Sequence, residues 1–241
     1  MIVVEAASHL FHPLRDGDEL PPLDARLAAV CREKYRRIDR FVQLALVGAG
    51  ECVAGRAVQP ACGLYLSSSI GPIGSNAIVQ QSIHRDAKLP MPFNFVNTLG
   101  TSAGYHVAKH LDLTSEAIFV SRRGASFEAA LACAVADLLS GVASQMLVAA
   151  VEECTVPLSR HRELLQLPPS CPLAEGSHWM LLARGDAPGR VVPEGELHDA
   201  SFDGYESRGA ARLTSFVQRH ADQRFGLTWS LAAGAQLVAL D

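Results

Sequence analysis

The sequence predicts an α/β fold in which helices cover both faces of a mostly parallel sheet. Strand-like and helical segments alternate along the 241 residues, and no repeat, low-complexity block or linker separates them. The clearest unit spans residues 117–151, where two β-rich segments flank one helical segment. Only Glu128 and Asp137 are charged in that helical segment, so the helix should be covered on more than one side. We therefore expect one domain over residues 1–241.

This central unit consists of strands at residues 117–121 and 145–151 around a helix at residues 125–140. Gly141 follows the last helical residue, and glycine readily takes the left-handed conformation that ends many helices. The turn at residues 121–126 joins the carboxyl end of a strand to the amino end of a helix, where α/β proteins commonly bind ligands. This turn is therefore the first candidate for a functional site.

Upstream of the central unit the sequence predicts two strands and a helix. The strands are expected at residues 2–7 and 61–68, and the helix at about residues 39–56. The helix should lie on the sheet through one apolar stripe, formed by Phe41, Leu44, Ala45, Gly48 and Cys52. Residues 11–23 are rich in proline and predict an exposed excursion. The glycine-rich turn at residues 69–76 lacks a following Lys-Ser pair, so it predicts a tight connection rather than a nucleotide loop.

The remaining segments extend the same pattern. Residues 92–110 predict a helix in which the small residues from Gly100 to Gly104 allow a neighbour to approach closely. The other expected elements are strands at residues 173–183 and 190–201, a helix at residues 209–223, and a segment at residues 226–241 that is ambiguous between helix and strand.

Charge and cysteine content exclude several classes of function. The net charge is −4 and the pI is near 6.1, so nucleic acid meets no overall positive field and is not an expected partner. Residues 32–40 form a dense basic run that is typical of a solvated helix start, with a docking patch for an acidic partner as the alternative. The six cysteines show no C-x-x-C spacing, so no metal site is expected.

The expected compartment follows from the cysteines and from the amino-terminal residues. Cys52 and Cys133 fall inside apolar helical patterns and predict buried free thiols in a reducing compartment. The first residues lack a basic stretch followed by a long apolar core, and no apolar run of about eighteen residues occurs. We therefore expect a cytoplasmic protein without a membrane span and without a cofactor.

Four segments of the chain follow one another in the order of a known family. They are residues 36–46 (Arg-Arg-Ile-Asp-Arg-Phe-Val-Gln-Leu-Ala-Leu), residues 92–108, the central unit, and residues 174–177 (Ala-Glu-Gly-Ser). Together they cover roughly residues 2–183, and they resemble the amino-terminal half of a β-ketoacyl synthase of the thiolase-like superfamily. The resemblance implies a thiolase-like half fold, layered α-β-α, with a mixed and mostly parallel sheet.

The resemblance also places Gly124 where a working synthase holds its nucleophilic cysteine. In the family that cysteine lies in a strained elbow at the head of a buried helix, whose dipole lowers the thiol pKa. The family's two catalytic histidines belong to a second half that is not expected in this chain, and none of the nine histidines stands in a His-Gly-Thr setting. Ketosynthesis needs all three groups. The resemblance therefore implies no catalytic residue here and catalysis in a partner ketosynthase.

Family members without the cysteine include the chain-length factors of type II polyketide systems, and this chain resembles the short ones of aryl polyene pathways. The resemblance implies a non-catalytic subunit that pairs with a full-length ketosynthase, as a heterodimer or higher assembly, and shapes its acyl tunnel. An acyl carrier protein would be met through that complex. The implied partner interface is Ala117, Ile118, Phe119, Val120 and Ser121. The implied tunnel-lining residues, which reach across the dimer axis, are Asn94, Phe95, Thr98 and Leu99.

Other roles remain open from the sequence. The chain can be a purely structural stabiliser of the ketosynthase with no influence on chain length. It can also be a decarboxylase or hydrolase acting on carrier-bound substrates, although Ser126 is followed by Glu128 rather than by the glycine of a Gly-x-Ser-x-Gly elbow. Ser126 otherwise reads as a helix-start residue. Arg122 and Arg123 can hold an anionic ligand at the helix start or pair with carboxylates of a neighbouring chain.

Overall fold

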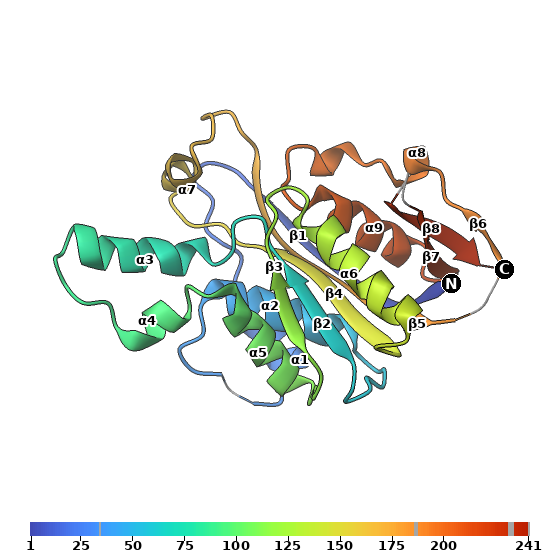
Figure 1. The fold of residues 1–241 in the computed structure, drawn as a ribbon. Coiled ribbons are helices and arrows are strands. Elements are labelled where there is room, and N and C mark those ends of the chain that lie inside the picture. Colours follow the sequence, from blue (N-terminus) through green and yellow to red (C-terminus); the bar gives the residue numbers. More distant parts are fainter. Residues whose placement is uncertain (34, 186–187, 231–233, 241) are drawn as a thin grey trace.

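The computed structural model arranges the chain around one eight-stranded sheet (Figure 1). It describes residues 1–33, 35–185, 188–230 and 234–240. The strands are β1 (Ile2–Leu14), β2 (Gly63–Ser67), β3 (Ala117–Val120), β4 (Gln145–Glu152), β5 (Leu173–Arg184), β6 (Gly189–Val191), β7 (Arg224–Ser230) and β8 (Gly234–Leu240). Their order across the sheet is β3-β2-β4-β5-β1-β7-β8-β6, so β3 and β6 form the two edges.

Helices cover both faces of this sheet, which confirms the predicted α/β class (Figure 1). They are α1 (Asp24–Val30), α2 (Arg40–Cys52), α3 (Ile73–His84), α4 (Pro92–Val96), α5 (Gly100–His110), α6 (Ser126–Ser140), α7 (Leu158–Leu165), α8 (Glu194–Leu197), the 3-10 helix η1 (Ala200–Phe202) and α9 (Arg208–Arg219). On one face α2 packs on β1 and β5 and is flanked by α1 and α5, whereas α6 and α9 cover the other face. No described helix has the length and apolar character that crossing a bilayer requires.

The sheet is mixed, but it is mainly antiparallel rather than mainly parallel. β2 pairs parallel with β3 and with β4. Every other strand pairing among the described residues is antiparallel, including those of β5 with β4 and with β1. The expectation of a mostly parallel sheet is therefore wrong. A strand that is buried along its length, as β5 is, has the same apolar sequence pattern in either direction.

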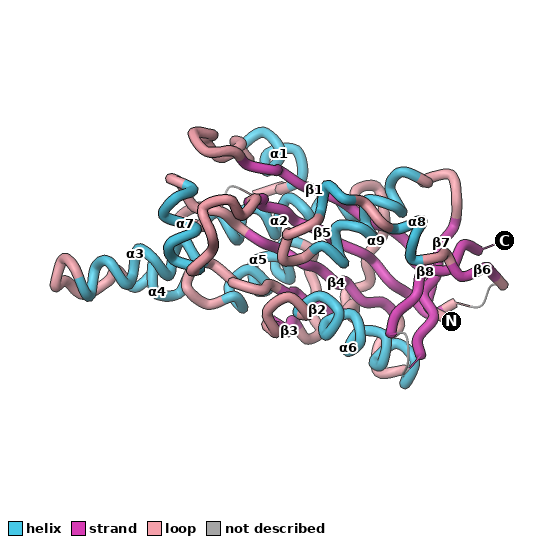
Figure 2. Tube along the Cα trace, turned by 90° about the horizontal axis from the view of Figure 1, so that it is seen from above, coloured by secondary structure: helices cyan, strands magenta, loops and turns pink. Residues whose placement is uncertain are grey.

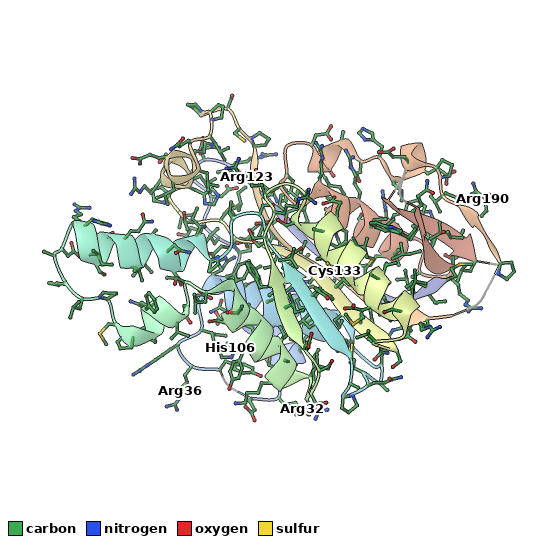
Figure 3. All side chains as sticks on the ribbon, in the orientation of Figure 1. Arg32, Arg36, His106, Arg123, Cys133 and Arg190 are labelled. Atoms are coloured by element: carbon green, nitrogen blue, oxygen red, sulfur yellow. The ribbon has the colours of Figure 1, made fainter. Side chains whose placement is uncertain are left out.

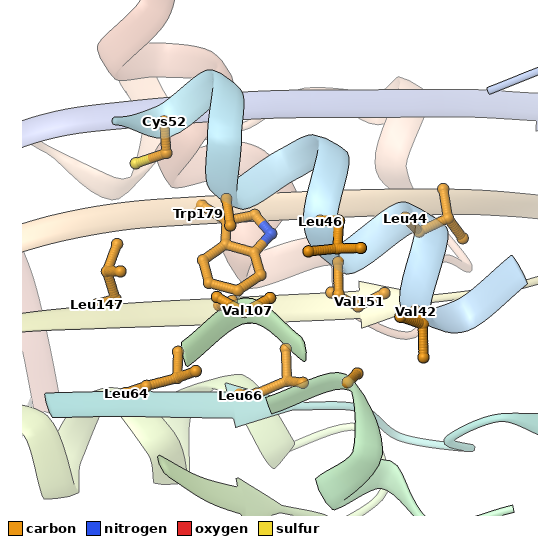
Figure 4. Packing of buried hydrophobic residues seen from close by; sticks show 14 of the residues in the cluster. Val42, Leu44, Leu46, Cys52, Leu64, Leu66, Val107, Leu147, Val151 and Trp179 are labelled. Atoms are coloured by element: carbon orange, nitrogen blue, oxygen red, sulfur yellow. The ribbon is translucent and has the colours of Figure 1, made fainter. Parts of the chain in front are cut away.

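The first core lies between α2, α5 and the sheet, and Trp179 is its largest fully buried side chain (Figure 4). The indole Nε1 donates a hydrogen bond to Ser177 Oγ at 2.8 Å. A Cβ atom on Gly48 of α2 would lie 2.2 Å from that Oγ atom, so glycine is needed for α2 to pack this closely on β5. The predicted helix is confirmed, but it is buried on most sides rather than along one stripe.

The second core lies under α6, whose predicted position is confirmed. Gly141 ends the helix with a φ of 81°, the left-handed conformation that the sequence predicts. The outer side of α6 is open, and Cys133 and Leu139 are exposed there (Figure 3). The prediction that Cys133 is buried is therefore wrong, whereas Cys52 is a buried free thiol as expected. An apolar outer side on a helix indicates a surface that another chain covers.

Several segments differ from their predicted structure. β1 continues to Leu14, because β5 provides hydrogen-bonding partners along its whole length, so the excursion begins only at residue 15. The segment at residues 190–201 forms only the short β6, followed by α8 and η1. The basic run at residues 32–40 is not a helix start, since α2 begins at Arg40 and is capped by Asp39; Lys34 lies outside the described residues. The turn after β2 ends at α3, a helix that the sequence analysis did not predict.

The carboxyl-terminal segment adds a helix and a hairpin to the sheet. α9 confirms the helix expected at residues 209–223. The ambiguous segment at residues 226–241 belongs to β7 and β8, which pair antiparallel; its residues 231–233 and 241 lie outside the described part. β7 also pairs with β1. The hairpin therefore continues the sheet on the side away from β3 (Figure 1).

A buried ion pair joins two of the segments that carry the family resemblance. Arg40, at the start of α2, donates from both Nε and Nη2 to the carboxylate of Glu175 on β5, with a distance of 2.7 Å for Nε. The same guanidinium donates to Pro21 O at 2.8 Å, and His12 Nδ1 lies 3.3 Å from the carboxylate. Glu175 is completely buried; burial raises its pKa, but the hydrogen bonds from Arg40 and His12 outweigh this and lower it overall.

Replacing Arg40 with leucine is expected to destabilise the fold strongly. The substitution leaves the buried carboxyl of Glu175 without its charged partner, and breaking such a pair typically costs about 3–5 kcal/mol. The free energy of unfolding, measured by urea titration, tests this. The matched control is Arg160→Leu, because Arg160 and Glu163 form an exposed pair on α7 and the expected cost is below about 1 kcal/mol. Equal losses in the two variants would contradict the assigned role of the buried pair.

Candidate functional site

The turn between β3 and α6 is sharp, and its backbone groups form hydrogen bonds with serine side chains. Arg123 has a φ of 50°, which is uncommon for a residue with a side chain. Its carbonyl oxygen accepts hydrogen bonds from Ser126 Oγ at 2.6 Å and from Ser69 Oγ at 2.7 Å. Ser126 Oγ also accepts from Arg122 N at 2.7 Å. We call residues 121–126 the elbow; Figure 3 labels Arg123 there.

Neither the position that the family resemblance gives to the cysteine nor Ser126 offers a free nucleophile in the elbow. Gly124, which the family resemblance places at the cysteine position, is exposed, and the positive φ falls on its neighbour Arg123. Neither has a thiol or hydroxyl group. Ser126 is buried, and its hydroxyl donates to Arg123 O, which makes it the helix-start residue expected rather than a hydrolase serine. The identity of Gly124 as the vacant nucleophile position stays a prediction.

The two arginines of the elbow extend into solvent. Arg122 and Arg123 are exposed, and in the described part of the chain neither forms an ion pair with a carboxylate. They are free to meet a charged group from outside the chain. Both interpretations, an anionic ligand or the carboxylates of a partner, therefore stay open.

A buried carboxyl group at the end of β4 is hydrogen-bonded to residues that contact the elbow. Glu152 accepts hydrogen bonds from Ser68 Oγ at 2.8 Å, from Ser69 N at 2.6 Å and from Ser207 Oγ at 2.8 Å. Burial raises its pKa, and these hydrogen bonds oppose that shift. Because Ser69 also binds the carbonyl of Arg123, Glu152 connects the elbow to the start of α9. Sequence analysis missed this network, since its members are far apart in the chain.

A cysteine and a histidine also meet in the interior, but they do not form a catalytic pair. Cys154 Sγ lies 3.8 Å from His161 Nε2 and donates to Ala174 O at 3.2 Å. His161 Nδ1 accepts from Thr155 N, so the proton of the neutral ring is on Nε2 and faces the sulfur. Burial raises the pKa of the Cys154 thiol to about 12. A thiol without a base and with this pKa is inert at neutral pH.

Two imidazoles, those of the half-buried His9 and the buried His178, connect β1 and β5 with α9 and the residues before it. His9 Nδ1 lies 3.0 Å from His178 Nδ1 and 3.2 Å from Thr214 Oγ1, while His178 Nε2 lies 3.3 Å from Tyr205 Oη. Burial, aided by Arg219, lowers the pKa of His9 to about 4, although Asp199 opposes the shift. Burial and His9 lower the pKa of His178. Both rings are therefore neutral in the folded protein at neutral pH.

This histidine pair predicts a loss of stability in acid. The unfolded chain binds a proton at His9 near pH 6.5 and the folded chain only near pH 4, so this stability is present above pH 6.5 and is lost as the pH falls toward 4. We expect wild type to lose about 1–2 kcal/mol relative to His9→Gln between pH 7.5 and 5.0. Urea unfolding at both pH values measures this, and His84→Gln, on exposed α3, is the control. If the difference in unfolding free energy between wild type and His9→Gln is the same at both pH values, the prediction is contradicted.

The residues expected to line a tunnel lie on a projecting segment, residues 73–99, which comprises α3, α4 and the loops that follow them (Figures 1 and 2). We call this segment the arm. Asn94 and Phe95 belong to α4, and Thr98 and Leu99 connect α4 to α5. Phe95 and Leu99 are exposed, and Asn94 and Thr98 are half-buried. Exposed large apolar side chains extend over α3, α4 and α5 to β3; they are Ile78, Ile83, Leu89, Met91, Phe93, Phe95, Val96, Leu99, Tyr105 and Ile118.

The predicted interface strand is the open edge of the sheet. β3 pairs with β2 on one side, and no other described strand lies beyond it. Ala117 and Ile118 are exposed, and Phe119 and Val120 are half-buried. α5 packs tightly beside this strand: a Cβ atom on Gly100 would lie 2.4 Å from the ring of Phe119, so the small residue accommodates a side chain, whereas the sequence predicts the approach of a backbone. Among the described residues no cluster of three potential metal ligands occurs.

The fold and the elbow place the chain in the α/β class, and comparison with known proteins identifies the family. The family described as "Beta-ketoacyl synthase, N-terminal domain" matches residues 15–163, so the chain belongs to the β-ketoacyl synthase family. A search of curated proteins by sequence found no match.

Solved structures of similar fold come from ketosynthase assemblies. A chain of the ishigamide ketosynthase/chain length factor has 17% identity and a TM-score of 0.58, with 85% of this chain and 80% of that chain covered. A chain of ketosynthase ApeO in complex with its chain length factor ApeC, from Xenorhabdus doucetiae, has 14% identity and a TM-score of 0.58, with 99% of each chain covered. A chain of AntDE:AntF, a type II acyl carrier protein in complex with its ketosynthase, has 16% identity, a TM-score of 0.55, and coverage of 76% and 57%.

Proposed function

We propose that this chain is a non-catalytic chain-length-factor subunit that pairs with an active β-ketoacyl synthase and shapes its acyl tunnel. The observation that carries the proposal is the elbow: a ketosynthase-family turn whose exposed residues include no thiol and whose buried serine is already hydrogen-bonded. Similarity in fold to chains from ketosynthase/chain length factor assemblies supports it. The biosynthetic setting we propose is type II polyketide, aryl polyene or fatty-acid-like synthesis in the cytoplasm.

The proposed partner surface comprises β3, the arm and the outer side of α6. β3 offers unpaired backbone groups along its free edge, and an edge strand of this kind readily pairs with another strand. Ile118 on β3, Phe95 on the arm and Leu139 on α6 are exposed apolar side chains. Large exposed apolar side chains on an edge strand and the neighbouring helices are typical of a protein–protein interface.

Two alternatives compete with this proposal. A purely structural stabiliser would use the same surface, and only product length distinguishes it from a tunnel-shaping subunit. A decarboxylase or hydrolase is disfavoured, because neither Ser126 nor Cys154 is available as a nucleophile. Mass spectrometry after exposure to an acyl-carrier substrate separates the enzyme from the other two, since only the enzyme gains a covalent acyl group.

Contact with an acyl carrier protein belongs to the same proposal. The loop before α2 carries exposed Arg36 and Arg37, and the Arg37 guanidinium lies 5.4 Å from the ring centroid of Phe93 near the arm (Figure 3 labels Arg36). This loop is therefore next to the proposed partner surface. A solvated loop and a docking patch for an acidic protein both remain open for it.

The chain produced alone is expected to self-associate, and co-expression with a full-length ketosynthase is expected to give a defined heterodimer. The physical reason is the exposed edge of β3 together with the apolar arm, which aggregate when nothing covers them. Size-exclusion chromatography with light scattering measures both states. A monodisperse monomer that does not change on addition of the ketosynthase would contradict the proposed function.

A further inference from the structure

Of the three consecutive residues 205–207 between η1 and α9, the first and the last contact different parts of the core, and the middle one is exposed. Tyr205 Oη lies 3.3 Å from His178 Nε2 on β5. Ser207 Oγ donates to Glu152 Oε1, at the end of β4, at 2.8 Å. Tyr205 and Ser207 are both buried, so their contacts fix the backbone on either side of the residue between them, Glu206. We call residues 205–207 the clasp.

The clasp places a carboxylate in front of the elbow. A Cβ atom added to Gly124 would lie 3.7 Å from Glu206 Oε2, and apart from its chain neighbours no other described heavy atom would lie within 4 Å. This separation is an ordinary van der Waals contact, so a side chain fits there without strain. Apart from the two chain neighbours, the group nearest to this Cβ position is the carboxylate of Glu206.

A carboxylate at this place opposes the chemistry of a ketosynthase elbow. A nucleophilic cysteine acts as a thiolate, which forms easily beside positive charge and with difficulty beside negative charge. An acyl donor that carries its own carboxylate is repelled in the same way. Arg122 and Arg123 are exposed on the elbow, and beyond the two chain neighbours of Gly124 it is Glu206 that lies nearest to the vacant position.

We propose that the clasp is an inhibitory element, in which the exposed carboxylate of Glu206 electrostatically disfavours a thiolate and anionic acyl groups at the elbow. The negative charge of Glu206 is a second obstacle to catalysis, separate from the missing nucleophile. It comes from the carboxyl-terminal segment, beyond the residues that match the family. The contacts of Ser207 with Glu152 and of Tyr205 with His178 fix the backbone on both sides of Glu206. This property belongs to the chain itself and does not depend on which ketosynthase is its partner.

The test introduces a thiol at the elbow and measures its reactivity. Gly124→Cys is compared with the double variant Gly124→Cys/Glu206→Gln in the full chain, by pulsed iodoacetamide labelling followed by peptide mass spectrometry. Removal of one carboxylate charge a few ångströms away is expected to speed labelling of the introduced thiol roughly five- to tenfold at pH 7.5 and to shift its pH profile downward. Cys133, which is exposed on α6, is the internal reference in every sample.

The control is Gly124→Cys/Glu194→Gln, since Glu194 is an exposed carboxyl on α8 that does not contact the elbow. It should label at the rate of Gly124→Cys alone. Gly124→Cys/Glu206→Lys is a second variant, expected to label faster still because it replaces the negative charge with a positive one. Equal labelling rates in the Glu206→Gln, Glu206→Lys and Glu194→Gln backgrounds, relative to Cys133, would overturn the proposal even if the chain forms its heterodimer normally.

Discussion

Replacing Ile118 with lysine is expected to abolish the heterodimer with the ketosynthase while this chain stays folded. Ile118 lies on the open edge strand β3 and is 38% exposed, so the monomer tolerates a charge there. In the proposed complex the same position is covered by the partner, and an unpaired buried charge costs about 3 kcal/mol or more, equivalent to roughly a 100-fold loss of affinity. Charged residues on edge strands prevent strand pairing in many proteins for this reason. Analytical ultracentrifugation of the co-expressed pair measures the loss.

The matched control lies at the opposite edge of the sheet. Val191 on β6 is 41% exposed, so Val191→Lys makes the same chemical change at an equally accessible edge position outside the proposed interface. It should leave the heterodimer intact. If Val191→Lys dissociates the heterodimer and Ile118→Lys does not, the interface lies at the β6 edge of the sheet and the proposed β3 interface is wrong. Far-ultraviolet circular dichroism of both variants confirms that any effect arises from binding rather than from unfolding.

Local patterns predicted the central unit well because its signals are confined to neighbouring residues. The alternation of β-rich and helical segments located β3, α6 and β4, and Gly141 ended the helix as its conformational freedom suggests. The prediction that Cys133 on the outer side of α6 is buried was wrong. An apolar helix indicates that something covers it but not which chain does so, and Cys133 is exposed because this chain leaves that side open.

The internal networks could not be predicted from the sequence, since their partners are distant in the chain. Ser68 and Glu152 are 84 positions apart, and His9 and His178 are 169 positions apart. No periodicity or motif connects such residues, and only the strand order brings them together. The direction of β5 could not be predicted for a similar reason. A strand that is buried on both faces has the same apolar sequence pattern whether it pairs parallel or antiparallel. The family resemblance supplied the elbow, but the clasp lies beyond the residues it covers.

Asn94→Phe is expected to shorten the product of the complex while the heterodimer stays intact. The proposed tunnel is lined by Asn94, Phe95, Thr98 and Leu99, on the arm that is expected to reach across the dimer axis. Asn94 is half-buried and its side chain makes no hydrogen bond in the described structure, so a larger ring changes volume without breaking a contact. Added volume in a packed wall costs about 1–3 kcal/mol, which a domain of this size withstands. A rigid conjugated chain cannot coil around the ring, so its growth stops earlier.

Thr98→Phe is the second variant for the same wall, although it also removes the hydrogen bond from Thr98 Oγ1 to Phe95 O. The matched control is Val96→Phe, which adds a ring to an exposed position of α4 outside the expected tunnel. Chromatography of carrier-bound products from each complex gives the length distribution. Shorter products from Asn94→Phe and Thr98→Phe but not from Val96→Phe support a tunnel-shaping subunit. If all three variant complexes make products of unchanged length at normal turnover, these residues belong to ordinary interface packing. The chain is then a structural partner of the ketosynthase rather than a tunnel-shaping subunit.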